Sequence, residues 1–227
     1  MFDDLRIFRR WEAADIALIV FVYRGSNCIA KKVGLLQSKR LYPVSSEVDE
    51  DDPLNFAYGM NRFLSREPKQ AIGALHSRFD FTYNCTYGAL KSGAGQIQII
   101  RKLNDDFGKI CYYLFYNPPQ VPFSVQYPLR SRMVIENIDL GCQVYDPSVV
   151  DGVLDNLPEG TSPSLHTLQS SSRQQNWPLE EWASDLLLTC RVGQQFDDSR
   201  DAEVRSFLQR RSGPIGAALA VSITLAD

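Results

Sequence analysis

The chain has 227 residues, of which 44% are hydrophobic and 22% charged, values that suit one large globular domain or a core with one appendage. Its formal charge of −3 excludes binding to nucleic acid through a global positive field, so any such contact must come from local basic clusters. The longest apolar run, residues 16–23, is less than half as long as a membrane span, and the charged N-terminus does not resemble a signal peptide.

A β-hairpin is predicted near the N-terminus. Residues 14–23 are apolar and rich in β-branched side chains, as in a buried strand, and residues 29–40 form a return strand. Gly25 and Asn27, in the stretch between them, can take positive φ and therefore favour a tight turn. Residues 5–11 could form a preceding strand of the same sheet.

A strand–helix–strand unit is predicted to follow. Two helices are expected first, over residues 53–67 and about 68–79, after an acidic loop. Residues 87–108 then place apolar side chains at a helical period, and residues 109–119 form an aromatic-rich strand closed by two prolines. Because a crossover helix returns the chain in the same direction, we expect the last strand to lie parallel to the return strand of the hairpin.

The C-terminal part is predicted to add further helices and strands. Residues 159–178 are rich in Ser, Gln and Pro and predict a mobile surface loop. Residues 179–190 predict a helix with Trp182, Leu186 and Leu187 on its buried side. The remaining expected elements are a strand and loop over 132–147, a polar helix over 201–211 and a final buried strand over 213–226. The fold class is therefore α/β with a mixed central sheet, followed over residues 121–227 by a C-terminal α+β extension of unknown role packed on the same domain.

Polar side chains converge at one end of the predicted hairpin. If the turn is centred on Ser26, Asp15 lies directly opposite Gln37, and Lys39 shares the face of Gln37 two residues further on. Glu12 lies nearby and is a third candidate metal ligand. A carboxylate and an amide oxygen suit a hard cation such as Mg²⁺, and a lysine beside the metal can orient water or neutralise charge on a phosphate. This pattern predicts a site for cleaving phosphodiester bonds.

Asp15 followed by Gln37-Ser38-Lys39 on a hairpin, with a helix and a further strand, resembles the PD-(D/E)XK nuclease superfamily. It is most similar to the Mrr-like branch, in which glutamine replaces an acidic residue to give D…QxK. The resemblance covers roughly residues 5–120 and implies a restriction-endonuclease-like core over residues 1–120. It implies that Asp15 and Gln37 hold Mg²⁺ or Mn²⁺, that Lys39 serves catalysis, and that Gln96 on the crossover helix is an accessory residue.

Three functions are compatible with these patterns. The first is a metal-dependent nuclease acting on DNA, in bacterial defence or restriction by family analogy. The second is a catalytically inactive nuclease-fold subunit that binds nucleic acid or a protein partner, and the third is an intracellular interaction protein. About a dozen residues precede Asp15, too few for both a helix and a strand, so the site is incomplete, a homodimer or partner chain completes it, or the chain starts late. Phosphate contacts could come from a set of basic residues near one end of the sheet: Arg6, Arg9, Arg10, Lys31, Lys32 and Arg40.

Each candidate residue also has a plain structural interpretation. Lys39 could be a strand end that extends its ammonium group into solvent, and Asp15 a carboxylate that begins a strand. Glu12 and Gln96 could be solvated side chains. The five cysteines show no zinc-binding spacing, so we expect reduced thiols in a cytoplasmic protein without membrane contact. The chain has two histidines, and chemistry built on a histidine pair is not expected.

Overall fold

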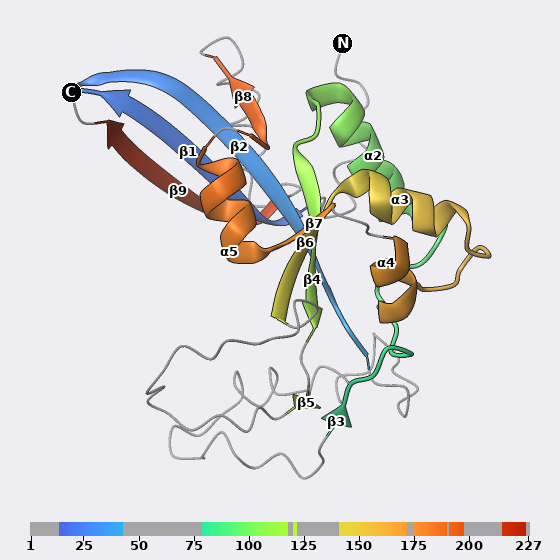
Figure 1. Cartoon of the computed structure of the whole chain (residues 1–227). Helices are drawn as coiled ribbons and strands as arrows, with labels where there is room; N and C mark the ends of the chain where they lie inside the picture. The colour runs from blue at the N-terminus through green and yellow to red at the C-terminus, as the bar shows by residue number, and fades with distance from the viewer. Residues whose placement is uncertain are drawn as a thin grey trace, which may run out of the picture.

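The fold is organised around one mixed β-sheet (Figure 1). The structure is a computed structural model that describes residues 14–42, 79–117, 120–121, 141–171, 175–189, 191–197 and 215–225. Within these residues, seven strands form the sheet in the order β7-β6-β4-β2-β1-β9, with β8 paired to β2. Their bounds are Ala14–Arg24 (β1), Asn27–Arg40 (β2), Cys111–Asn117 (β4), Gly141–Tyr145 (β6), Asn176–Pro178 (β7), Gln194–Phe196 (β8) and Ile215–Leu225 (β9). The described residues therefore form an α/β fold, as predicted.

The other described elements are helices and a small second sheet. The helices are Gly95–Phe107 (α2), Pro147–Asp155 (α3), Leu165–Ser171 (α4) and Leu179–Glu181 (α5), and the π-helical turn Trp182–Leu187 (η3) continues α5. Strands Phe79–Asp80 (β3) and Gln120–Val121 (β5) pair separately. No helix among the described residues has the length and apolarity needed to cross a membrane.

The predicted hairpin is confirmed. Strands β1 and β2 pair antiparallel, and Ile16 lies opposite Leu36. Gly25, at φ 55°, and Ser26 form the turn, where the left-handed conformation favours glycine. The register shifts by one residue between Val22 and Tyr23, so the pairing at the far end of the hairpin has the register expected for a turn centred on Ser26.

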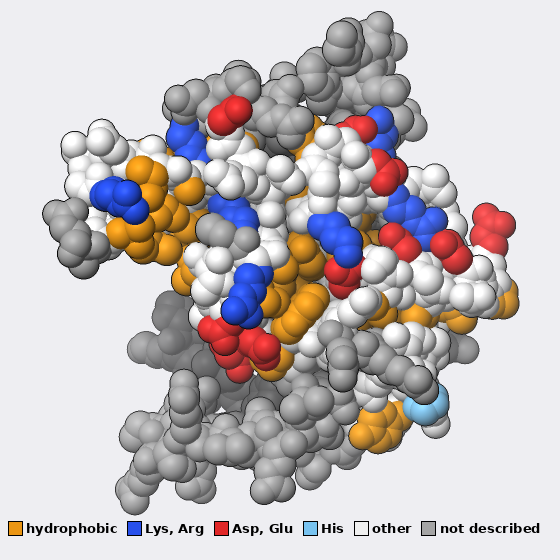
Figure 2. All heavy atoms as spheres, turned by 45° about the horizontal axis from the view of Figure 1, so that its top comes forward, with side chains coloured by type: hydrophobic (Ala, Val, Ile, Leu, Met, Phe, Trp, Pro, Cys, Tyr) orange, Lys and Arg blue, Asp and Glu red, His pale blue; other side chains and the backbone are white. Residues whose placement is uncertain are grey.

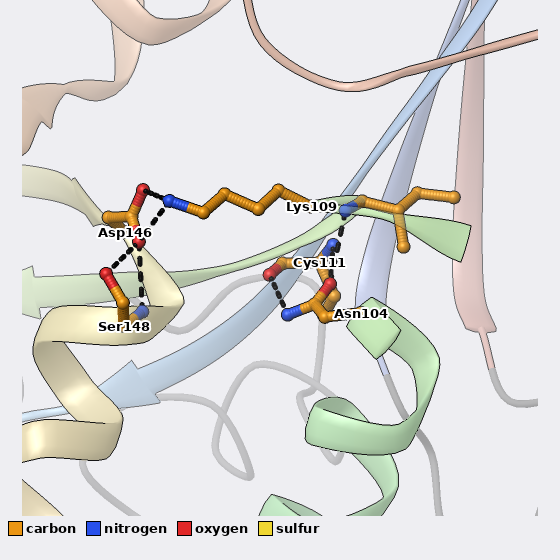
Figure 3. Close-up of polar contacts among 6 residues, drawn as sticks. Asn104, Lys109, Cys111, Asp146 and Ser148 are labelled. Carbon is orange, nitrogen blue, oxygen red and sulfur yellow. Dashed lines mark hydrogen bonds and ion pairs between the residues drawn. The ribbon is translucent and has the colours of Figure 1, made fainter. Parts of the chain in front are cut away.

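The predicted parallel crossover is also confirmed, although its helix is shorter than expected. Strand β4 runs parallel to β2 after α2. The helix begins at Gly95, and residues 87–94 form successive turns that include Gly93 at φ 79°. A positive φ cannot continue a right-handed helix, which explains the later start. Asn104 ties α2 to β4, because its side chain accepts from the amides of Ile110 and Cys111 and donates to the Cys111 carbonyl (Figure 3).

The prediction of a mobile loop over residues 159–178 is wrong. This stretch contains α4 and β7, and β7 extends the sheet by pairing antiparallel with β6. Helix α4 buries Leu165 and Leu168, and the Ser164 hydroxyl caps its start by accepting from the amide of Thr167. Two buried leucines outweigh the polar composition, which by itself suggested a loop.

The two faces of the sheet carry separate apolar cores. On the first face, α2, α3 and α4 pack on alternate residues of the strands, including Leu35, Tyr113 and Phe115. On the second face, Trp182 and Leu187 pack against Leu36 and its neighbours. Within the π-helical turn these two side chains are five residues apart, a spacing that matches its i→i+5 hydrogen bonds. The predicted helix over 179–190 is therefore confirmed in this form, and Leu187 is buried more deeply than Leu186.

The last strand is present, but it is not buried as predicted. Strand β9 pairs parallel with β1 at the edge of the sheet, and Leu219 is 57% exposed. The predicted strand over residues 132–147 is present in part as β6. The predicted strand over 5–11 and the helices over 53–67 and 201–211 lie outside the described residues. So does the helix over 68–79, apart from its last residue, which belongs to β3.

Candidate active site

Asp15 and Gln37 lie side by side at the end of the hairpin. The pairing of Ile16 with Leu36 makes Asp15 and Gln37 the next pair in register, on the face that carries α2. The Gln37 Nε2 atom donates to Asp15 Oδ2 at 2.9 Å, and the Ser38 amide donates to the same oxygen at 2.5 Å. These two bonds fix the orientation of the carboxylate. The predicted proximity is confirmed, and the roles of the two residues stay a prediction.

The amide oxygen of Gln37 is buried without a hydrogen-bond partner. Gln37 is 3% exposed, and its Nε2 atom must face Asp15, because the opposite orientation would place two acceptor oxygens against each other. The Oε1 atom therefore makes no hydrogen bond, and its lone pairs are unused. An orphaned buried acceptor costs about 1–3 kcal/mol, a cost that a bound cation would remove.

Lys39 is buried, so its interpretation as a strand end extending into solvent is wrong. The side chain is 6% exposed, and its Nζ atom donates to Gln96 Oε1 at 2.6 Å. Gln96 stands in the first turn of α2, so the crossover helix contacts the lysine directly. The half-buried Gln96 is accordingly a partner of Lys39 and is not simply a solvated helix residue.

The charges of Asp15 and Lys39 both affect the pKa of the buried Cys111 thiol. Cys111 lies in register with Leu35 on β4, next to the strand that carries Gln37 and Lys39. Burial raises the pKa of its thiol, the negative charge of Asp15 raises this pKa further, and the positive charge of Lys39 opposes both effects. The thiol therefore stays protonated at neutral pH and is not a nucleophile.

Aromatic side chains of β4 lie next to Gln37 and Lys39 on the same face of the sheet. Tyr113 is in register with Gln37, and Phe115 with Lys39. Their rings stack with centroids 6.2 Å apart. The Tyr113 hydroxyl is buried without a partner, and burial, reinforced by Asp151, raises the pKa of this group well above its usual value. The sequence predicted this strand as aromatic, and only its parallel register with β2 brings these two rings to the site.

The described residues provide a minimal set of metal ligands. Glu12 lies outside the described residues, and within them no group of three or more His, Cys, Asp or Glu side chains could hold a metal. The donors present are the Asp15 carboxylate and the Gln37 amide oxygen. Mg²⁺ commonly binds proteins through one or two carboxylates and completes its shell with water and phosphate oxygens. The residues fit a cation of this type on condition that substrate and water supply most of the ligands.

A second polar cluster, at the start of β4, is structural. The Lys109 Nζ atom contacts Asp146 Oδ2 at 2.9 Å, and the Ser148 amide donates to Asp146 Oδ1 at the start of α3 (Figure 3). Burial tends to raise the pKa of Asp146, but hydrogen bonds from Ser148 and Lys109 outweigh it and lower the pKa. Asp146 is thus the N-cap of α3, and Lys109 ties β4 to it.

The structure removes Lys32 from the predicted set of phosphate-contacting basic residues and gives Arg40 an aromatic partner. Lys32 is 4% exposed and lies on the second face of the sheet, so it cannot contact a phosphate beside Asp15. Arg40 stacks 4.5 Å over the ring of Tyr42. The other predicted members, Arg6, Arg9 and Arg10, lie outside the described residues. Figure 2 shows Lys and Arg side chains interspersed with Asp and Glu on the face it presents, without a broad basic area.

A surface depression beside α2 is a poorer candidate for a site. It is lined by Ser92, Ile97, Arg101, Leu154 and Glu159, among others. The Arg101 guanidinium already contacts Asp151 at 3.0 Å and Asp155 at 2.7 Å. Because both carboxylates neutralise it, this arginine is not available to bind an anion.

No known protein family matches this chain, and neither the characterised proteins nor the solved structures contain a significant match. The four cysteines in the described residues are free thiols, as predicted: Cys28, Cys85, Cys111 and Cys142.

Proposed function

We propose that this protein is a metal-dependent phosphodiesterase acting on nucleic acid, with DNA as the expected substrate. The observation that carries the proposal is the grouping of Asp15, Gln37 and Lys39 on one face of two adjacent strands. The second of these strands continues through α2 into the parallel strand β4. This order of elements supports a restriction-endonuclease-like core, in which a metal and a lysine act together on a phosphate.

Each residue has a distinct task in the proposed site. A bound Mg²⁺ or Mn²⁺ would polarise the phosphate and activate water. Asp15, oriented by Gln37 and the Ser38 amide, and the orphaned Gln37 oxygen would hold the cation. Lys39 would place its ammonium charge beside the phosphate oxygens, where negative charge develops in the transition state. Gln96 holds the lysine in place and acts as a positioning residue.

Incubation of the protein with supercoiled plasmid, linear DNA and RNA tests the proposal. We expect cleavage in Mg²⁺ or Mn²⁺ and none in EDTA. Among the described residues the proposed site has one carboxylate, that of Asp15, so a bound cation must supply the positive charge that polarises the phosphate. Loss of cleavage in a Lys39→Met variant, with cleavage retained in Lys32→Met, would assign the activity to this face. Cleavage that persists in EDTA would contradict the proposal.

A second function follows if cleavage is absent with every metal. Lys39 and Gln37 are both nearly inaccessible, and the described residues contain no group of three or more His, Cys, Asp or Glu side chains that could hold a metal, which would suit a subunit that binds without cleaving. In that case we expect DNA binding that weakens steeply with salt, because phosphate contacts release counterions. Fluorescence anisotropy with labelled DNA over a range of salt concentrations measures this. The absence of both cleavage and binding would favour a protein-interaction role.

A further inference from the structure

Strand β9 is a long edge strand without charge. It spans 11 residues, Ile215–Leu225, and contains no Asp, Glu, Lys, Arg or Pro. Among the described strands its one neighbour is β1, and Figure 1 shows it on the outer side of the sheet, away from α2, α3 and α4. Edge strands usually carry charges, prolines or bulges that prevent pairing with other chains. Strand β9 carries no charge or proline, and its paired residues follow β1 without a register shift.

The side chains of β9 alternate strictly between the two faces. Because Ala17 pairs with Ala218, the even-numbered residues of β9 share the first face with α2 and are small or polar, from Ala218 to Thr224. The odd-numbered residues, from Leu219 to Leu225, are aliphatic and share the second face. Leu219 is 57% and Leu225 39% exposed. The sequence of β9 is thus typical of a strand that has a neighbouring strand on each side.

Among the described strands, the opposite edge of the sheet is poorly suited to pairing. It is formed by β7, which has three residues and ends in Pro178, a residue without an amide proton. Among the described strands, β9 is thus the long edge strand that another strand can extend, since β7 and the off-path strand β8 each have three residues, and pairing of two copies through β9 closes without forming a fibre. Because β9 can pair and β7 is poorly suited to pairing, we expect two copies to associate through their β9 strands as a closed dimer.

We propose that β9 is a homodimerisation strand, which pairs antiparallel with β9 of a second copy around a two-fold axis perpendicular to the sheet. A two-fold axis in this direction keeps each face of the sheet continuous, so aliphatic residues meet aliphatic residues and small residues meet small residues. The absence of charge in β9 removes the repulsion that two identical charged strands would suffer. A partner strand also satisfies the outward-facing backbone amides and carbonyls.

The dimer would place the two candidate active sites on the same side of one continuous sheet. Asp15 stands between Ala14 and Ile16, which pair with Ile215 and Ala217, so it is level with Gly216 at the start of β9. With the two-fold axis near Ala220, strand spacings of ~4.8 Å and rises of ~3.3 Å put the two Asp15 residues about 30 Å apart. The pairing itself does not depend on the proposed phosphodiesterase activity.

Sedimentation velocity over a hundredfold range of concentration tests the dimer. One pair of edge strands makes a small interface, so we expect a dissociation constant on the order of 10 µM. Leu219→Lys places like charges near the two-fold axis and should weaken the dimer about tenfold or more. Ile29→Lys is the matched control, because Ile29 is also an exposed aliphatic residue, at 46%, but lies on β2, beyond β1 from β9. A wild-type monomer at every concentration, or a Leu219→Lys variant that dimerises like wild type, would overturn the proposal.

Disulfide cross-linking tests the register. Residues that face their own copy across the axis lie within disulfide reach, at Cα separations of about 4.5–5.5 Å. In a background in which the exposed Cys28 is replaced by Ser, one of Leu219→Cys, Ala220→Cys and Val221→Cys should form a covalent dimer under mild oxidation. Equal cross-linking by all three variants would indicate nonspecific collision and would contradict a defined antiparallel register.

Discussion

Replacing Lys39 by Met separates the functional role of this residue from its structural role. The side chain is 6% exposed and bonded to Gln96, so truncation to Ala would remove packed methylenes as well as the charge. Met keeps nearly the same volume, and loss of a buried ammonium relieves its desolvation cost. We therefore expect Lys39→Met to change the free energy of unfolding by less than about 1 kcal/mol, and Lys39→Ala to be about 2 kcal/mol less stable than Lys39→Met.

The effect on activity should be large and equal in both variants. Loss of a charge that acts on the phosphate in the transition state typically costs on the order of 10²-fold in rate, or about 2.7 kcal/mol. Urea unfolding followed by tryptophan fluorescence measures stability, and plasmid cleavage in Mg²⁺ measures activity. Lys32→Met is the control, because Lys32 is a buried lysine of the same strand on the opposite face.

Two results would refute this reasoning. If Lys39→Met unfolds at the same urea concentration as Lys39→Ala, the buried methylenes of Lys39 do not stabilise the fold as its burial implies. If Lys39→Met cleaves as fast as wild type while Lys32→Met does not, the active face has been assigned to the wrong side of the sheet.

Three further variants test other parts of the structure. Asp15→Asn keeps an acceptor for the Ser38 amide but removes the negative charge, so calorimetry should show Mn²⁺ binding weakened about tenfold or more at nearly unchanged stability. Gly34→Ala places a methyl group 2.9 Å from the Trp182 ring, and urea unfolding should show a loss of about 1–3 kcal/mol. Asp146→Ala removes the N-cap of α3 and should cost about 1 kcal/mol at neutral pH. The pKa of Asp146 is lowered in the fold, so the contribution of its carboxylate to stability is present above the ordinary pKa of 3.8 and is lost as the pH falls through the lowered pKa. The difference in unfolding free energy between wild type and Asp146→Ala should therefore narrow below about pH 4. Urea titrations at several pH values measure this.

The sequence alone determined the elements whose geometry is local. The hairpin itself follows from its turn signal. Its turn at Gly25 and Ser26 alone would pair Asp15 with Leu36, and the one-residue shift after Val22, which the sequence did not predict, restores the expected pairing of Asp15 with Gln37. The strand–helix–strand order likewise predicts the parallel pairing of β2 with β4, because a helical crossover returns the chain in the same direction. Alternation along a strand then sets which residues share the face of Gln37.

Tertiary structure decided what is buried, because burial depends on which elements pack together and not on the residues of one strand. Lys39 has the sequence context of a solvated strand end, yet α2 covers it and supplies Gln96. Strand β9 has the composition of a core strand, yet it lies at the edge of the sheet with Leu219 exposed. The polar stretch that contains Leu168 is ordered for the same reason, since the hydrophobic contacts of one or two side chains outweigh the average composition of their neighbours. Hydrophobic contacts between residues far apart in the sequence are non-directional and non-local, and so the sequence pattern of a single segment does not specify them.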